Sequence, residues 1–178
     1  MKLKRILVPI DFSASSLAAL DYAAELTTGF SPELLLLFVL EPVQFASAGH
    51  VYGSPTPINV ESLIAEQRRL AQADLADLAA RLTRRGVRAR TAIGEGAPHR
   101  VIVDTASRLG ADLIAMGTHG RTGLSRLFMG SVAEMVARHA GCPVLTVRGQ
   151  DARGTRGKAR GKARKGRRAG RPRSSRTK

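Results

Sequence analysis

Apolar residues occur along the chain in short runs of the length of β-strands, separated by longer amphipathic segments. The apolar runs cover residues 5–10, 33–40, 87–93, 112–116 and 143–147. The segments between them carry apolar residues three or four positions apart, which is the spacing of one helix face. Helices are therefore expected over residues 13–28, 58–85, 98–109 and 131–140. Regular alternation of strands and helices predicts an α/β domain built on a parallel sheet.

The polarity of each run predicts where its strand lies in the sheet. Runs 33–40 and 112–116 are almost wholly apolar, which is typical of strands covered on both faces. In run 87–93, Arg88 and Arg90 alternate with smaller residues and predict an edge strand with one face in solvent. Five such strands predict a flavodoxin-like or Rossmann-like doubly wound sheet of order 3-2-1-4-5, with helices on both faces. Ligands of such sheets bind at the carboxyl ends of the strands.

The apolar periodicity stops near residue 149, and the charge changes there. Residues 1–152 carry a formal charge of +2, whereas residues 153–178 carry +13 and contain no acidic residue. We expect one domain over residues 1–148 and a tail over 149–178. The tail is rich in Arg, Lys, Gly and Ala, so it cannot bury enough apolar surface to offset its ordering entropy and is predicted to be disordered.

Composition excludes several classes of protein. A single cysteine, Cys142, rules out a disulfide framework and a cysteine-rich zinc site. No apolar run reaches the length of a membrane span, and Pro9 and Asp11 interrupt the first run too early for a signal peptide. We therefore expect a cytoplasmic protein without membrane insertion. Metal-ligand spacing is also missing among the four histidines, which are His50, His99, His119 and His139.

The segment GTHGRTGLSRLFMGS, residues 117–131, joins the fourth predicted strand to the last predicted helix. Glycines in such a loop let backbone N–H groups turn toward a ligand without obstruction by a Cβ atom. Successive N–H groups form an anion-binding nest, and the helix N-terminus adds its partial positive charge. The loop therefore predicts a phosphate site, although the G-x-x-x-x-G-K-[ST] phosphate-binding motif does not occur in it.

Within this loop, Gly117, Gly120, Gly130 and Ser131 form the pattern G-x2-G-x9-G-S. This pattern resembles the nucleotide-binding loop of the universal stress protein family. The similarity extends to ILVPIDFSASSLAAL near the N-terminus and to the segment 111–148, so it covers about residues 3–148. The resemblance implies a dimeric, ATP-binding stress-response or regulatory protein, with Mg²⁺ accompanying the phosphates.

The resemblance also assigns roles to individual residues. Asp11 would accept hydrogen bonds from the ribose hydroxyls, and Val39 would meet the adenine through its backbone. Residues 116–117 would line the entrance to the ribose and phosphates, and loop residues would hold the phosphates through N–H groups and a hydroxyl. The implied nucleotide contacts are Pro9, Asp11, Val39, Met116, Gly117, Gly120, Gly130, Ser131 and Val132.

Several of these residues also have a purely structural interpretation. Asp11 is placed to cap the first helix, Val39 is a core residue in any such fold, and Ser131 with Glu134 has the spacing of a capping box. Gly130 would lie just before that cap, where capping does not require a glycine. Both interpretations stay open for Asp11, Val39 and Ser131.

No enzymatic site is evident in the sequence. Ser125 and Ser131 have no evident Ser–His–Asp arrangement, and no base for phosphoryl transfer stands out. We expect a nucleotide sensor with at most slow ATP hydrolysis or autophosphorylation. The last strand, Pro143 to Val147, is an open apolar edge, and the resemblance implies that a homodimer forms through it.

Two segments leave alternatives open. Residues 41–57 form a Pro/Gly-rich loop that serves either as a lid or as a simple connection. Residues 153–178 would bind phosphate backbones in a salt-dependent way, which suggests a nucleic-acid-associated protein as the alternative function. Aromatic residues are missing from this tail, which disfavours stacking on single strands. A solvated extension, a compositional arginine bias, and contact with anionic lipid or acidic proteins are further interpretations.

Overall fold

The computed structural model describes residues 3–41, 60–118 and 130–148. Gly120, the predicted loop 41–57 except Glu41, and the basic tail lie outside the described residues. The strands are β1 (Arg5–Pro9), β2 (Glu33–Leu40), β3 (Ala89–Glu95), β4 (Leu113–Gly117) and β5 (Val144–Val147). The helices are α1 (Ala14–Phe30), α2 (Val60–Arg84), α3 (Pro98–Leu109) and α4 (Ser131–His139).

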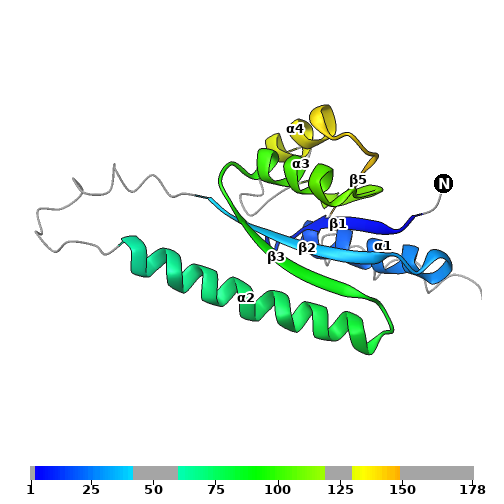
Figure 1. Ribbon diagram of the computed structural model, residues 1–178, viewed down its shortest axis with the longest axis horizontal. Helices are drawn as coiled ribbons and strands as arrows, with labels where there is room; N and C mark the ends of the chain where they lie inside the picture. Colours follow the sequence, from blue (N-terminus) through cyan, green and yellow to red (C-terminus); the bar gives the residue numbers. More distant parts are fainter. Residues whose placement is uncertain (1–2, 42–59, 119–129, 149–178) are drawn as a thin grey trace, which may run out of the picture.

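The five strands form one parallel sheet of order β3-β2-β1-β4-β5, so the predicted topology is confirmed (Figure 1). Ile6 of β1 pairs with Leu34 of β2 on one side and with Leu113 of β4 on the other. The chain runs outward from β1 through β2 to β3 and then crosses to β4. The order of the strands therefore reverses between β1 and β4, which is the switch point beside which such sheets bind ligands.

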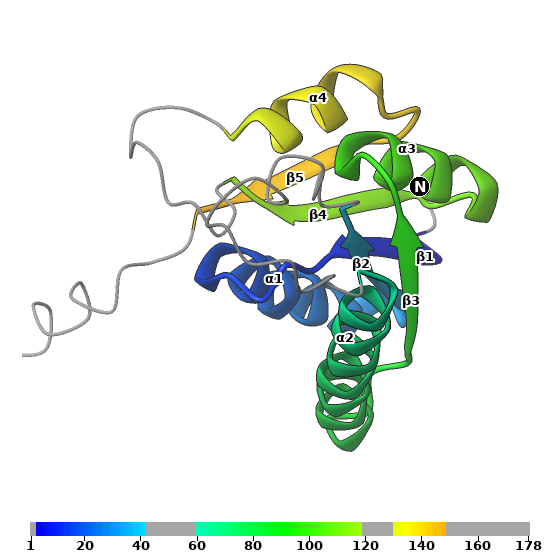
Figure 2. The ribbon, with the colours of Figure 1, turned by 90° about the vertical axis from the view of Figure 1, so that its left-hand side faces the viewer.

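Helices cover both faces of the sheet, α1 and α2 on one and α3 and α4 on the other (Figure 2). Alternate residues along a strand point to opposite faces, and the buried core divides accordingly. Ile6 and Val8 of β1 belong to the cluster beneath α1 and α2, whereas Leu7 belongs to the cluster beneath α3 and α4. The burial of both faces, which the continuous apolar runs 33–40 and 112–116 predicted, is therefore confirmed.

β3 forms one edge of the sheet, as its alternating pattern predicts. Arg88 and Arg90 are both exposed. The Arg90 Nε atom lies 2.8 Å from Glu33 Oε1 on the neighbouring strand, and the Arg88 guanidinium donates to the Ser31 carbonyl. The strand begins at Ala89 rather than Val87 because its pairing with β2 starts at Leu34.

α2 is 25 residues long, and its two halves have different surroundings. The second half packs on the sheet through the buried residues Leu75, Leu78 and Leu82. In the first half, residues 61–70 are exposed or half-buried. Among the described residues no helix, α2 included, is long and apolar enough to cross a membrane.

The beginning of α4 differs from the sequence prediction. Gly130, rather than Ser131, is the N-cap residue, and no side chain caps this helix. Ser131 is the first helical residue, and the Glu134 carboxylate pairs with Arg138 at 2.7 Å instead of reaching back to the helix start. The predicted capping box is therefore wrong, because the helix begins one residue earlier than that motif requires.

Candidate functional site

A cleft of about 620 Å³ lies at the carboxyl edge of the sheet. It is bounded by the ends of β1, β2 and β4, by the first turns of α1, α3 and α4, and by one face of α2. The cleft therefore straddles the sheet edge, with α2 on one side and α4 on the other. Eight of the nine predicted nucleotide contacts line it, and the ninth, Gly120, lies outside the described residues. The eight are Pro9, Asp11, Val39, Met116, Gly117, Gly130, Ser131 and Val132.

The turn between β1 and α1 places Asp11 in the cleft. Ser13 is the N-cap of α1, and its hydroxyl accepts a hydrogen bond from the Ser16 N–H at 3.2 Å. The half-buried Asp11 carboxylate accepts the Ser13 N–H at 3.0 Å. Asp11 therefore supports the turn that precedes the helix, while the capping itself belongs to Ser13.

Phe12 occupies a left-handed backbone conformation, with φ of 63°. For a non-glycine residue this conformation costs about 1–2 kcal/mol. The Phe12 ring lies 5.6 Å from the ring of Phe38, centroid to centroid, and both residues line the cleft. Such a ring contact contributes about 0.5–1.5 kcal/mol and offsets part of the strain. Sequence analysis missed both residues, because an unfavourable φ at a phenylalanine has no local signature.

Gly117 has a structural requirement that the sequence did not reveal. A Cβ atom at this position would lie 2.6 Å from the Ser15 Oγ atom and 2.8 Å from the Ser15 carbonyl carbon. The start of α1 therefore approaches β4 so closely that no side chain fits between them. Glycine is needed at 117 whether or not a ligand is bound.

The N-terminus of α4 presents backbone donors to the cleft. The Gly130 N–H, which was expected to face phosphates, instead donates to the Thr118 carbonyl at 2.7 Å. The next three N–H groups, those of residues 131–133, have no carbonyl partner within the helix. All three residues line the cleft, and no side chain caps the helix. The described donors for an anion are therefore the amides of Ser131, Val132 and Ala133.

The charged side chains that line the cleft are all acidic among the described residues: Asp11, Glu41 and Asp74. The N-terminus of α4 carries the partial positive charge of the helix dipole. The cleft is therefore electrostatically polarised, with a partial positive charge at α4 and acceptor groups toward β1, β2 and α2. A ligand with an anionic end and a hydrogen-bond-donating end matches this polarity.

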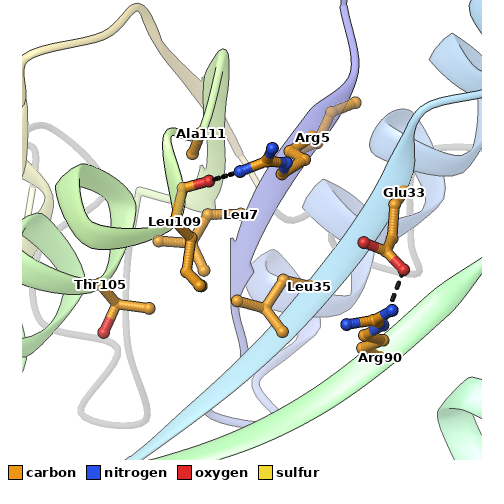
Figure 3. Close-up of a pocket in the computed structure, with 9 residues that line it drawn as sticks. Arg5, Leu7, Glu33, Leu35, Arg90, Thr105, Leu109 and Ala111 are labelled. Atoms are coloured by element: carbon orange, nitrogen blue, oxygen red, sulfur yellow. Dashed lines mark hydrogen bonds and ion pairs between the residues drawn. The ribbon is translucent and has the colours of Figure 1, made fainter.

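A second cavity, of about 80 Å³, lies at the amino edge of the sheet against α3 (Figure 3). Leu7 and Leu35 form part of its wall. The Arg5 guanidinium donates to the Leu109 carbonyl, and Arg90 pairs with Glu33 at 2.8 Å. These polar groups bind one another rather than converge on the cavity, so the larger cleft is the candidate functional site.

No group of three or more His, Cys, Asp or Glu side chains within the described ranges is arranged to hold a metal ion. The site consists of backbone donors, three carboxylates, of which Asp11 lies just after β1, and apolar walls. This combination, at the carboxyl edge of a doubly wound sheet, is typical of an α/β domain that binds a small anionic ligand.

The chain belongs to the universal stress protein family, whose model matches residues 2–148. Universal stress protein MJ0531 of Methanocaldococcus jannaschii is 35% identical over 145 residues, which are 82% of each chain. The solved structure of MJ0577, a universal stress protein of the same organism, superposes with a TM-score of 0.72 at 29% identity. That likeness covers 85% of this chain and 100% of the other.

Two further structures with this fold contain adenine nucleotides. A universal stress protein in complex with cAMP has a TM-score of 0.62 at 24% identity, covering 84% of this chain and 100% of that one. The Archaeoglobus fulgidus protein in complex with dAMP has a TM-score of 0.57 at 21% identity, covering 83% and 99%. At these identities the likeness to this chain is one of fold.

Proposed function

We propose that this universal stress protein binds ATP in the cleft at the carboxyl edge and acts as a nucleotide-dependent regulatory protein. The observation that carries the proposal is that hydrogen-bond donors and a hydrogen-bond acceptor lie in the same cleft. The amides of residues 131–133 and the Asp11 carboxylate line one cleft. The amides suit the phosphates, and the carboxylate suits the ribose hydroxyls, which donate hydrogen bonds.

The order of the strands indicates how a nucleotide would be oriented along the cleft. β4, β1 and β2 are neighbours, and adjacent strands lie about 4.8 Å apart. Gly117, Asp11 and Val39, near the ends of these strands, therefore follow one another along the cleft. A nucleotide with its phosphates at α4 would place its ribose near Asp11 and its base near Val39. The cAMP and dAMP complexes of proteins with this fold are consistent with an adenine nucleotide.

Mg²⁺ would accompany the triphosphate in this proposal. The described residues fit an ion held mainly by phosphate oxygens and water, which is the usual coordination of Mg²⁺ beside nucleotides. The chain's own contribution would be to orient the nucleotide through the α4 amides and Asp11. Because the described groups at the proposed phosphate position are backbone amides, which do not take up a proton, we infer a role in binding and signalling rather than in rapid turnover.

Calorimetric titration with Mg²⁺-ATP tests the proposal. We expect the wild-type protein to bind and Gly130→Glu to lose binding, because a carboxylate at the N-cap would repel the phosphates. Gly141→Glu is the matched control: it lies beyond the other end of α4, where a Cβ meets no atom within 4 Å. Absence of binding by the wild type, or undiminished binding by Gly130→Glu, would refute the assignment.

A homodimer through β5 is part of the same proposal. β5 is an edge strand paired only with β4 among the described strands. Val144 and Leu145 are half-buried rather than buried. A second copy of the strand would cover them and would form hydrogen bonds with the backbone groups of the open edge. Sedimentation equilibrium should give the mass of a dimer at micromolar concentration, whereas a monomer mass there would contradict this.

The charge of residues 153–178 supports a second candidate, nucleic-acid association. Thirteen positive charges without an acidic residue favour contact with phosphate backbones. The affinity of such contacts falls steeply as the salt concentration rises. Gel-shift titrations of the full chain and of a chain truncated at residue 150 test it. Unchanged DNA affinity after truncation would rule the tail out, whereas a loss confined to the truncated chain would support it.

A further inference from the structure

One face of α2 lines the cleft and has no role in the nucleotide contacts proposed so far. It consists of Gln67, Leu70, Ala71 and Asp74. Their spacing of three, four and seven residues places them on the same side of a helix. The face is amphipathic, since an apolar pair at its centre is flanked by an amide and a carboxylate.

This face is the continuation of the surface that α2 packs on the sheet. Farther along the helix, Leu75, Leu78 and Leu82 are buried in the core. Leu70 lines the cleft, and 49% of it is exposed. Together with Phe38 and Leu40, which line the same cleft, it provides apolar surface that a planar group would cover.

The topology places this wall at the base end of the proposed nucleotide. α2 packs against β2 and β3, and β2 lies two strands from β4, beside which the phosphates would bind. This step rests on the proposed function, because it takes the phosphates to be at α4. The remaining polar groups of the face then meet the edge of the base.

We propose that this face of α2 selects the base, with Asp74 accepting a hydrogen bond from an exocyclic amino group while Leu70 covers the ring. A carboxylate only accepts hydrogen bonds, and an acceptor in a nucleotide site discriminates strongly against a base that presents an oxygen at the same place. Adenine carries such an amino group. Hypoxanthine carries a carbonyl oxygen in its place and a proton on N1, and is otherwise the same purine.

Competition between ATP and ITP, each with Mg²⁺, tests the inference. We expect the wild-type protein to bind ATP at least about tenfold more tightly than ITP, since one charge-assisted hydrogen bond supplies about that factor. Asp74→Asn should lower the ratio about fivefold, because an amide both donates and accepts. Asp77→Asn is the matched control, an exposed aspartate three residues along α2 that does not line the cleft, and it should keep the ratio.

A second pair of variants tests the apolar wall. Leu70→Ala should weaken both nucleotides by about the same factor, severalfold for the loss of a partly covered leucine side chain. Leu63→Ala, which removes a similarly exposed leucine outside the cleft lining, should leave both affinities unchanged.

The outcomes separate this inference from the proposed function. Binding of ATP and ITP with equal affinity, or a ratio unchanged in Asp74→Asn, would overturn the role of α2 and leave nucleotide binding established. Failure of both nucleotides to bind the wild-type protein would overturn the proposed function itself. A ratio that falls in Asp74→Asn and persists in Asp77→Asn would support the inference.

Discussion

The helix ends at the two edges of the sheet leave backbone groups of opposite polarity without a partner in the helix. Helices α1, α3 and α4 begin at the carboxyl edge, where their first N–H groups point outward. Helix α3 ends at the amino edge, where its last carbonyl groups point outward. At the amino edge the chain supplies its own partners: the Arg5 guanidinium donates to the Leu109 carbonyl. The Asp112 carboxylate also accepts the N–H groups of Lys4 at 2.7 Å and of Arg5 at 2.9 Å.

At the carboxyl edge, the start of α4 has no such partner among the described residues. Its first helical amides open onto a cleft of about 620 Å³, against about 80 Å³ at the amino edge. The difference is consistent with our proposal that one edge stabilises the fold and the other binds a ligand. Substitutions at matched positions on the two edges test this distinction.

The largest effect is expected from Gly117→Ala at the carboxyl edge. The new methyl group would lie 2.8 Å from the Ser15 backbone, which a rotamer change cannot relieve. We expect the free energy of unfolding to fall by about 2–3 kcal/mol, as in other overpacked sites. Urea denaturation measures the change. Gly141→Ala, in open space, should stay within about 0.5 kcal/mol of the wild type, and an equally small change at Gly117 would contradict the close approach of α1.

A smaller effect is expected from Gly110→Ala at the amino edge. Gly110 ends α3 in a left-handed conformation with φ of 57°, and a Cβ there would lie 3.5 Å from Arg5 Nη1. Because space is available, the cost is that of the backbone alone, about 1 kcal/mol. Gly110→Asn should recover part of the loss, since asparagine tolerates this conformation better. Equal stabilities of all three proteins in urea would show that the helix end does not impose this conformation.

The smallest effect is a pH dependence at the amino edge. Hydrogen bonds from the Arg5 and Lys4 N–H groups lower the pKa of Asp112 below its ordinary value. The resulting stabilisation is present above the unfolded-state pKa of about 4 and is lost as the pH falls through the folded-state pKa. Asp112→Asn should therefore flatten the fall of unfolding free energy below about pH 4. The exposed Asp104→Asn is the control, and an unchanged slope in Asp112→Asn would contradict the role of these bonds.

The sheet could be predicted from the sequence because a strand buried on both faces consists of a continuous run of apolar residues. The strand order, the edge position of β3 and the cleft at the carboxyl edge all follow from the runs and their alternation. The predicted start of β3 was two residues early, since its first residue is set by pairing with β2 rather than by local pattern. Strand ends of this kind depend on tertiary contacts.

Other parts of the site could not be predicted, because they depend on distances between elements. Nothing near Gly117 in the sequence indicates that Ser15 lies against it. The periodicity of α2 predicts an amphipathic helix but does not show that Leu70 and Asp74 line the cleft. Ser131 and Glu134 have the spacing of a capping box, yet the position of Gly130, set by its bond to Thr118, makes Ser131 the first helical residue.

A backbone-amide NMR titration with Mg²⁺-ATP tests the position of the nucleotide most directly. We expect the largest chemical-shift changes at the amides of Ser131, Val132 and Ala133, with further changes near Asp11. The amides of the amino edge, Arg5 among them, should remain unperturbed. Saturation by ATP with no change at the start of α4, or with changes confined to the amino edge, would contradict the assignment of the nucleotide to this cleft.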